Sequence, residues 1–395
     1  MKNDMTSGEP RKLLFWFILP LFISAVFQQL YSVFDSVIAG RAINTDALAA
    51  VGASYPITMI FIAVAIGSSM GASVVISQLF GARAYGRLKT AVSTAICTAL
   101  ALSAVMTVVG KLFSRQMLLL LKTPENIMKD STVYLDIYIY GLVFLFLYNV
   151  VTGIFQALGN SKIPLFLLIA SSVGNIILDI LFVVGFDMGV AGVGWATFLA
   201  QGVSAVVSLS LLLAYIKKMK LEGEGQMFSW EMLGKISTIA LPGICQQSFV
   251  SVGNLFVQSV INAYGSSVIA GYNVGLKISM FIITCSFAFG NGLGSFAAQN
   301  LGAGKLDRVF EGFRPCVLVC FFGAEFLVRL FLQDADTEAV STGIAYLRIL
   351  SPFYLILMMK FICDNILKAS ADMGAFMVTT FSDLIFRVAF AYILS

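Results

Sequence analysis

The feature that most constrains this chain is a succession of long apolar runs, separated by short breaks rich in charged, glycine or asparagine residues. A bilayer span needs about 20 apolar residues, and many of these runs are longer, which predicts helices that tilt or extend beyond the hydrocarbon. Only 12% of the residues are charged, roughly half the fraction of an average soluble domain. The sequence therefore predicts an all-α polytopic membrane protein. The eleven predicted helices lie near 13–40, 46–78, 91–121, 131–158, 163–185, 189–216, 235–263, 267–300, 313–332, 342–368 and 373–395.

The composition excludes several classes of function. The chain has no histidine, which rules out a histidine metal site, a Ser-His-Asp triad and a histidine proton relay. It has no Walker or dinucleotide-binding motif, so we expect neither ATP-driven transport nor a bound cofactor. No nucleophile and base stand at a useful spacing, so we expect no enzyme. The net charge of +4 comes from loop lysines and arginines and does not indicate a nucleic-acid partner.

The distribution of lysine and arginine predicts how the chain is oriented. With the N-terminus inside, fifteen of these cations, Lys368 among them, lie on the cytoplasmic side and seven on the outer side. The sequence thus predicts a cytoplasmic N-terminus in the plasma membrane. One sizeable polar connection, Lys217 to Lys235, divides the chain. We expect an N-terminal bundle at 1–218, a cytoplasmic linker at 219–234 and a C-terminal bundle at 235–395.

The two halves repeat each other at an offset of about 221 residues. The matched positions are Leu19-Pro20 with Leu241-Pro242, 48–60 with 269–281, and Gln78, Gly81, Ala82 and Arg87 with Gln299, Gly302, Ala303 and Arg308. Six helices separate the two copies, so both start on the same side and form parallel repeats. The counterpart of the sixth helix would lie beyond Ser395, which predicts six helices in the first bundle and five in the second. Glycine pairs Gly67/Gly71 and Gly290/Gly294 indicate close helix packing.

Six ordered motifs carry a resemblance that extends over nearly the whole chain. They are LYSVFDSVIAGR (30–41) with LAAVGASYPI (48–57), GASVVISQLFGAR (71–83), FQALGNSKIPL (155–165), NIILDILFV (175–183) and GSFAAQNLGAGKLDRV (294–309). In these motifs the chain resembles the multidrug and toxic compound extrusion (MATE) family of efflux transporters. The resemblance implies two pseudo-symmetric six-helix bundles around a central cavity, the twelfth helix being absent here. It also implies export of organic cations in exchange for Na⁺ or H⁺.

Carboxylates inside membrane spans are costly and are therefore candidate functional groups. Asp35 lies about 7 Å and Asp179 about 9 Å from the outer ends of their helices, at 1.5 Å per residue. Asn175 lies one turn from Asp179, and Thr197 enters the next helix at about 12 Å depth. If these helices bundle, the four side chains meet at one level. Their oxygens suit Na⁺, and two close carboxylates would alternatively share a proton.

The resemblance adds two tyrosines to this candidate cation site. Tyr31, four residues before Asp35, and Tyr134, at the start of the fourth helix, match the amino-terminal-lobe cation site of the family. The coupling set is therefore predicted as Asp35, Asp179, Asn175, Thr197, Tyr134 and Tyr31, with Na⁺ held by the first four. The alternative is that each polar group only caps or bonds a neighbouring helix.

The second half differs, because Val257 stands at the position matched to Asp35. We expect coupling to depend on the first bundle, although Asp364 remains a candidate. Lys360 lies one turn from Asp364 and is predicted to pair with it, as Arg387 is with Asp383.

Three functions remain open from the sequence. The first is an antiporter that exports cationic amphiphiles, whose contact residues the sequence does not identify, although aromatic and methionine side chains suit such substrates. The second is a lipid-linked oligosaccharide flippase, which would need a basic cavity built from Lys277, Lys360 and Arg387. The third is an inactive fragment. The expected partners are small molecules and membrane lipid.

Overall fold

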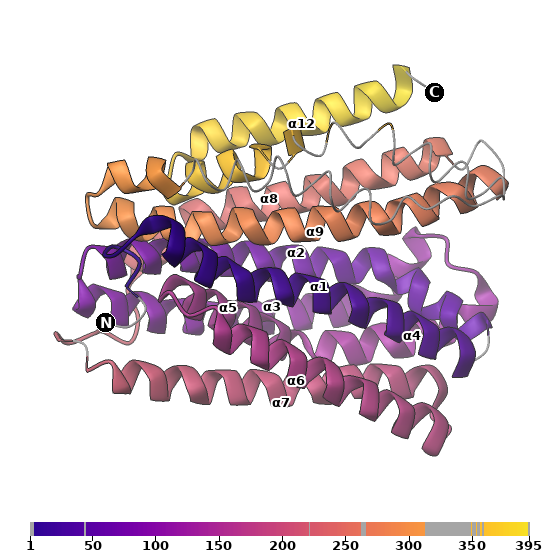
Figure 1. The fold of residues 1–395 in the computed structure, drawn as a ribbon. Helices are drawn as coiled ribbons and strands as arrows, with labels where there is room; N and C mark the ends of the chain where they lie inside the picture. The colour runs from indigo at the N-terminus through magenta and orange to yellow at the C-terminus, as the bar shows by residue number, and fades with distance from the viewer. Residues whose placement is uncertain are drawn as a thin grey trace. The chain divides into compact units, whose positions relative to one another are not determined.

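The computed structural model describes residues 4–42, 45–220, 222–261, 266–312 and most of 349–393. Within these ranges the chain forms helices joined by short turns, and no strand (Figure 1). The helices are α1 (Pro10–Ala42), α2 (Thr45–Gly81), α3 (Tyr85–Leu120), α4 (Glu125–Tyr140), α5 (Leu142–Ala157), α6 (Lys162–Asp179), the π-helix η1 (Ile180–Gly185), α7 (Gly189–Lys218), α8 (Trp230–Ile261), α9 (Ser266–Gly302) and α12 (Met373–Ile393). The segment 359–369 is also helical.

Six of the described helices are long and apolar enough to cross a membrane, and α4 with α5 would make a seventh. The chain is thus an all-α, multi-pass membrane protein, as predicted. The eleven-helix count stays a prediction, because the expected helix at 313–332 and most of that at 342–368 lie outside the described residues. The division at 218 and 235 is likewise untested.

The predicted single helix at 131–158 is wrong in detail. The helix starts earlier, at Glu125, and α4 and α5 meet at an angle of 47° at Gly141. Glycine lacks a side chain to hold the helical backbone, so sharp kinks concentrate at such residues. The break divides the span into two straight segments.

A second local irregularity follows Asp179, where the sequence suggested one uniform helix over 163–185. The last six residues, Ile180–Gly185, wind as a π-helix. A π-turn inserts an extra residue into each hydrogen-bonded ring, and such turns recur at functional sites. Here the change of winding begins directly after the buried carboxylate.

By its contacts the chain separates into two compact units. Unit 1 comprises Met1–Val26, Ser77–Arg83 and Cys245–Ser395, and unit 2 comprises Phe27–Ile76 and Ala84–Ile244. In unit 2, α7 packs against α4, α5 and α6, and α3 packs against α4 and α5 (Figure 1). The Ser69 hydroxyl donates to the backbone carbonyl of Asn149 at 2.6 Å, which binds α2 to α5.

The repeat found in the sequence appears in unit 1 as a reciprocal contact. A Cβ added to Gly81 would overlap the backbone of Gln299, and one added to Gly302 would overlap that of Gln78. The ends of α2 and α9 therefore cross at these two glycines. The glycine of each helix lies against the glutamine of the other helix, and both pairs of residues are matched in the repeat.

The predicted role of the other glycines also holds. Gly67 packs against Ile244 of α8, and Gly71 packs against Ala240, with no room for a side chain. Gly290 and Gly294 both lie against Asn365. Small residues at these positions allow the backbones to approach closely.

The N-terminal segment is bound to the end of α9 within unit 1. The amide of Met5 donates to Gln299 at 3.2 Å, and Lys305 donates to the carbonyl of Thr6 at 2.8 Å. The Arg308 guanidinium donates to Gly8 and to the Asn300 side chain, at 2.8 and 3.0 Å. These bonds satisfy backbone groups ahead of α1 and fix where that helix starts.

Candidate functional site

The centre of the candidate site is Asp179, the last residue of α6. It is 1% exposed, and Asn175, one turn earlier on the same helix, is 4% exposed. A carboxylate is rarely buried to this degree in a protein unless other groups stabilise it. The structure thus places two of the predicted oxygen ligands together, inside the protein and not facing lipid.

Two further predicted residues come from helices that pack with α6 directly or through α7. Thr197 lies partly buried on α7, which packs against α6 (Figure 1). Tyr134 lies partly buried on α4, which also packs against α7, and its ring stacks on Tyr138 with centroids 6.5 Å apart. The helices that carry four of the six predicted residues are therefore neighbours in one bundle.

The remaining two residues, Tyr31 and Asp35, lie on α1, and their side chains are outside the described part of the chain. Their backbone belongs to unit 2, which begins at Phe27 in this region. All six predicted residues therefore belong to the same compact unit. The direct pairing of Asp35 with Asp179 stays a prediction.

The second half contains a different polar cluster, around Asp364. Its side chain is 2% exposed and accepts hydrogen bonds from Gln246 at 3.0 Å and from Thr379 at 3.1 Å. The Lys360 ammonium lies 3.4 Å from Asp364 and 3.8 Å from Asp383. The predicted pairing of Lys360 with Asp364 is confirmed, so an ammonium from the chain itself neutralises this carboxylate.

Lys368 is a residue whose burial the sequence analysis missed, since it entered only the count of cytoplasmic cations. It is 2% exposed, and its ammonium lies over the ring of Phe376, 5.1 Å from the ring centroid. Counting charges along the chain does not reveal that α12 folds back over the end of the segment 359–369 that carries Lys368. The available signal was spacing, because Lys360, Asp364 and Lys368 recur every four residues on one helix face.

Comparisons with known proteins agree with this architecture. The sequence profile of the MatE family matches residues 20–181 and again 242–393, so the two matches start at the two repeat prolines. The probable multidrug resistance protein YpnP of Bacillus subtilis is 29% identical over 384 residues, which cover 94% of this chain and 85% of that protein. The multidrug export protein MepA of Staphylococcus aureus is 24% identical over 355 residues, which cover 84% of this chain and 76% of that protein.

A solved structure shares the fold. The outward-facing conformation of a MATE family multidrug resistance transporter superposes with a TM-score of 0.89 at 22% identity, covering 100% of this chain and 90% of that one. At this identity the likeness concerns the fold alone. It supports the predicted fold class of an all-α transporter with two bundles.

Proposed function

The chain belongs to the MatE family, and we propose that it is a secondary antiporter of the plasma membrane that exports organic cations in exchange for H⁺ or Na⁺. The family membership supports transport across a membrane. The names of the relatives YpnP and MepA support drugs as the substrate class. Amphiphilic cations fit an acidic first bundle, whose carboxylates supply the opposite charge.

The observation that carries the coupling proposal is the burial of Asp179 beside Asn175 at the start of the π-turn. A proton or Na⁺ would neutralise this carboxylate and reduce the cost of keeping it away from water. Because a ligand shifts two conformations only through its different affinity for them, the site must differ between the inward- and outward-open states. The break at η1 is a place where the backbone of α6 can rearrange around the ion.

In the proposed cycle, the ion and the substrate cation compete for the same negative charge. Ion entry from outside neutralises Asp179 and Asp35, which weakens the attraction for the substrate and favours its release. Return of the ion to the cytoplasm restores the charge for the next substrate. The ion gradient thus supplies the free energy for export, without ATP or a cofactor.

The experiment is ethidium efflux from cells that express the chain, with Na⁺ and pH gradients imposed separately. We expect efflux under one of the two gradients and a loss of at least about tenfold in Asp35→Asn and Asp179→Asn, because neither amide can exchange a proton or balance Na⁺. Asp187→Asn is the matched control. It lies exposed eight residues after Asp179, at a φ of 52° that asparagine tolerates.

Efflux by Asp179→Asn equal to that of the wild type would refute the assigned role of this carboxylate. Efflux without dependence on either gradient would refute antiport itself. Absence of efflux from a well-inserted wild-type chain would favour the alternatives of a flippase or an inactive fragment. The flippase alternative needs a basic cavity built from Lys277, Lys360 and Arg387. Of these, Lys360 is paired with two carboxylates, and the side chains of Lys277 and Arg387 lie outside the described residues.

A further inference from the structure

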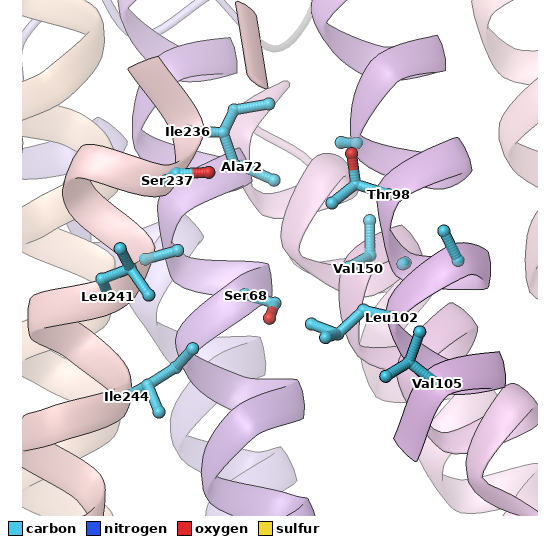
Figure 2. Close-up of a pocket in the computed structure, with 14 residues that line it drawn as sticks. Ser68, Ala72, Thr98, Leu102, Val105, Val150, Ile236, Ser237, Leu241 and Ile244 are labelled. Atoms are coloured by element: carbon cyan, nitrogen blue, oxygen red, sulfur yellow. The ribbon is translucent and has the colours of Figure 1, made fainter. Parts of the chain in front are cut away.

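An apolar groove lies in unit 2, apart from the candidate ion site. It has a volume of about 340 Å³ and is formed between α3 and α8, with α2 and α5 behind them (Figure 2). Its walls include Leu102 and Val105 of α3 and Leu241 and Ile244 of α8. Small residues such as Ala72 make its floor. The groove therefore exists because α3 and α8 do not fill the space in front of α2.

The lining presents almost no hydrogen-bonding groups. The Ser68 hydroxyl donates to the carbonyl of Val64 at 2.7 Å, and that of Thr98 donates to the carbonyl of Thr94 at 2.7 Å. The hydroxyl hydrogens of Ser68 and Thr98 are thus used by their own helices, and Ser237 supplies the one further hydroxyl of the lining (Figure 2). A polar ligand would lose its bonds to water here without replacement, whereas an alkyl chain would not.

The rim of the groove is open on the surface of the protein. Val105 is 54% and Leu241 is 61% exposed, and Ala101, one turn before Val105 on α3, is also exposed. In a multi-pass membrane protein, an exposed apolar rim along a spanning helix such as α3 faces the hydrocarbon. The groove is therefore accessible sideways to the acyl chains of lipids.

Basic groups stand at one end of this groove. Arg87 lies on the same face of α3 as Ala95, Thr98 and Leu102, and about 12 Å before Ala95 at 1.5 Å per residue. Its guanidinium bonds Glu231 of α8 at 2.8 Å, and Lys235 bonds the same carboxylate at 2.6 Å. Lys89 adds a third cation nearby, donating to the carbonyl of Gly223 at 2.9 Å. Arg87 and Lys235 thus share one acid, Glu231, and Lys89 lies two residues after Arg87 on α3.

We propose that this groove binds an anionic glycerophospholipid. One acyl chain lies between α3 and α8, and the phosphate lies at the cations Arg87, Lys89 and Lys235. The side chains of Arg87 and Lys235 are 54% and 48% exposed, so both can reach a headgroup. Basic residues beside a span attract anionic lipids. The lipid would join α3 to α8. The linker that leads from α7 to α8 already contacts α3, through the hydrogen bond from Lys89 to Gly223.

Native mass spectrometry of the purified full chain tests the proposal, with phosphatidylglycerol and phosphatidylethanolamine added separately. We expect the first phosphatidylglycerol molecule to bind at least about fivefold more tightly than the first phosphatidylethanolamine molecule. Ala101→Phe should reduce this binding about fivefold or more, because the ring enters the groove at its exposed rim. Ala104→Phe is the control, since Ala104 is exposed one turn further along α3 and does not line the groove. Equal binding by these two variants would overturn the proposal.

Two charge variants test the headgroup position. Arg87→Gln should weaken phosphatidylglycerol binding, and Glu231→Gln should strengthen it, while both break the same ion pair. A purely structural role of the pair predicts the same change in both variants. Phosphatidylglycerol with a diazirine in its acyl chain should crosslink to 95–105 or 236–244, and crosslinks confined to other helices would refute the assigned groove. None of these measurements depends on transport.

Discussion

At the scale of single residues, the two halves of the chain treat buried carboxylates differently. Asp179 in the first half lies beside the amide-bearing Asn175, and both are almost fully buried. Asp364 in the second half has an ammonium, an amide and a hydroxyl as partners. A built-in ammonium leaves little need for an ion from solution. The pairing of Asp364 with Lys360 therefore gives no support to ion coupling in the second half.

The ion pair of Lys360 makes a prediction about stability. Lys360→Met leaves Asp364 buried without its cation, and we expect the free energy of unfolding to fall by about 1–3 kcal/mol. This is less than for breaking a fully buried ion pair, because the Lys360 side chain is 25% exposed. Thermal unfolding in detergent, followed by size-exclusion chromatography, measures it. The double variant Lys360→Met/Asp364→Asn should recover part of the loss. Strictly additive losses would contradict the pairing.

At the scale of elements, a close helix crossing joins the ends of α2 and α9. Gly81 faces the backbone of Gln299, and Gly302 faces that of Gln78. The side chain of Gln78 also donates a hydrogen bond to the carbonyl of Ala369 at 2.8 Å. This bond adds the segment 359–369 to the crossing. The repeat thus has a structural consequence, because two copies of one motif form a single symmetric contact.

This crossing predicts that an added methyl group is not tolerated there. Gly81→Ala and Gly302→Ala should each destabilise the protein by about 1–3 kcal/mol, since backbone atoms must move apart. Their effects should be less than additive, because both act on one contact. Gly52→Ala on α2 is the control. No atom lies within 4 Å of its added Cβ, so alanine should be neutral or slightly stabilising in thermal unfolding.

At the scale of the whole molecule, orientation follows from the positive charges near the helix ends. The linker after α7 and the turn before α7 lie at opposite ends of one spanning helix, Gly189–Lys218. They must therefore face opposite sides of the membrane. The charge count predicts that the linker is inside.

Single cysteines in a background without the six native ones test this orientation. On intact cells, a membrane-impermeant maleimide should label Met188→Cys, in the turn before α7, and should spare Glu222→Cys in the linker. Permeabilised cells should label both, which controls for accessibility. Labelling of Glu222→Cys alone in intact cells would reverse the predicted orientation.

The sequence by itself determined the class of the protein, the spanning helices and the internal repeat. Apolar runs longer than 20 residues leave few alternatives, because backbone groups in hydrocarbon must bond within the segment. The Asn175–Asp179 spacing also sufficed to place two site residues on one helix face. These are local properties, and they need no knowledge of which helices are neighbours.

Only the tertiary structure decided which helices meet and what their meeting does to single residues. It located the 47° bend at Gly141, the π-turn after Asp179 and the groove between α3 and α8. It also buried Lys368 beneath Phe376, which the charge count does not address. Burial, kinks and grooves depend on the packing of segments distant in the chain, and composition along one segment does not encode those contacts.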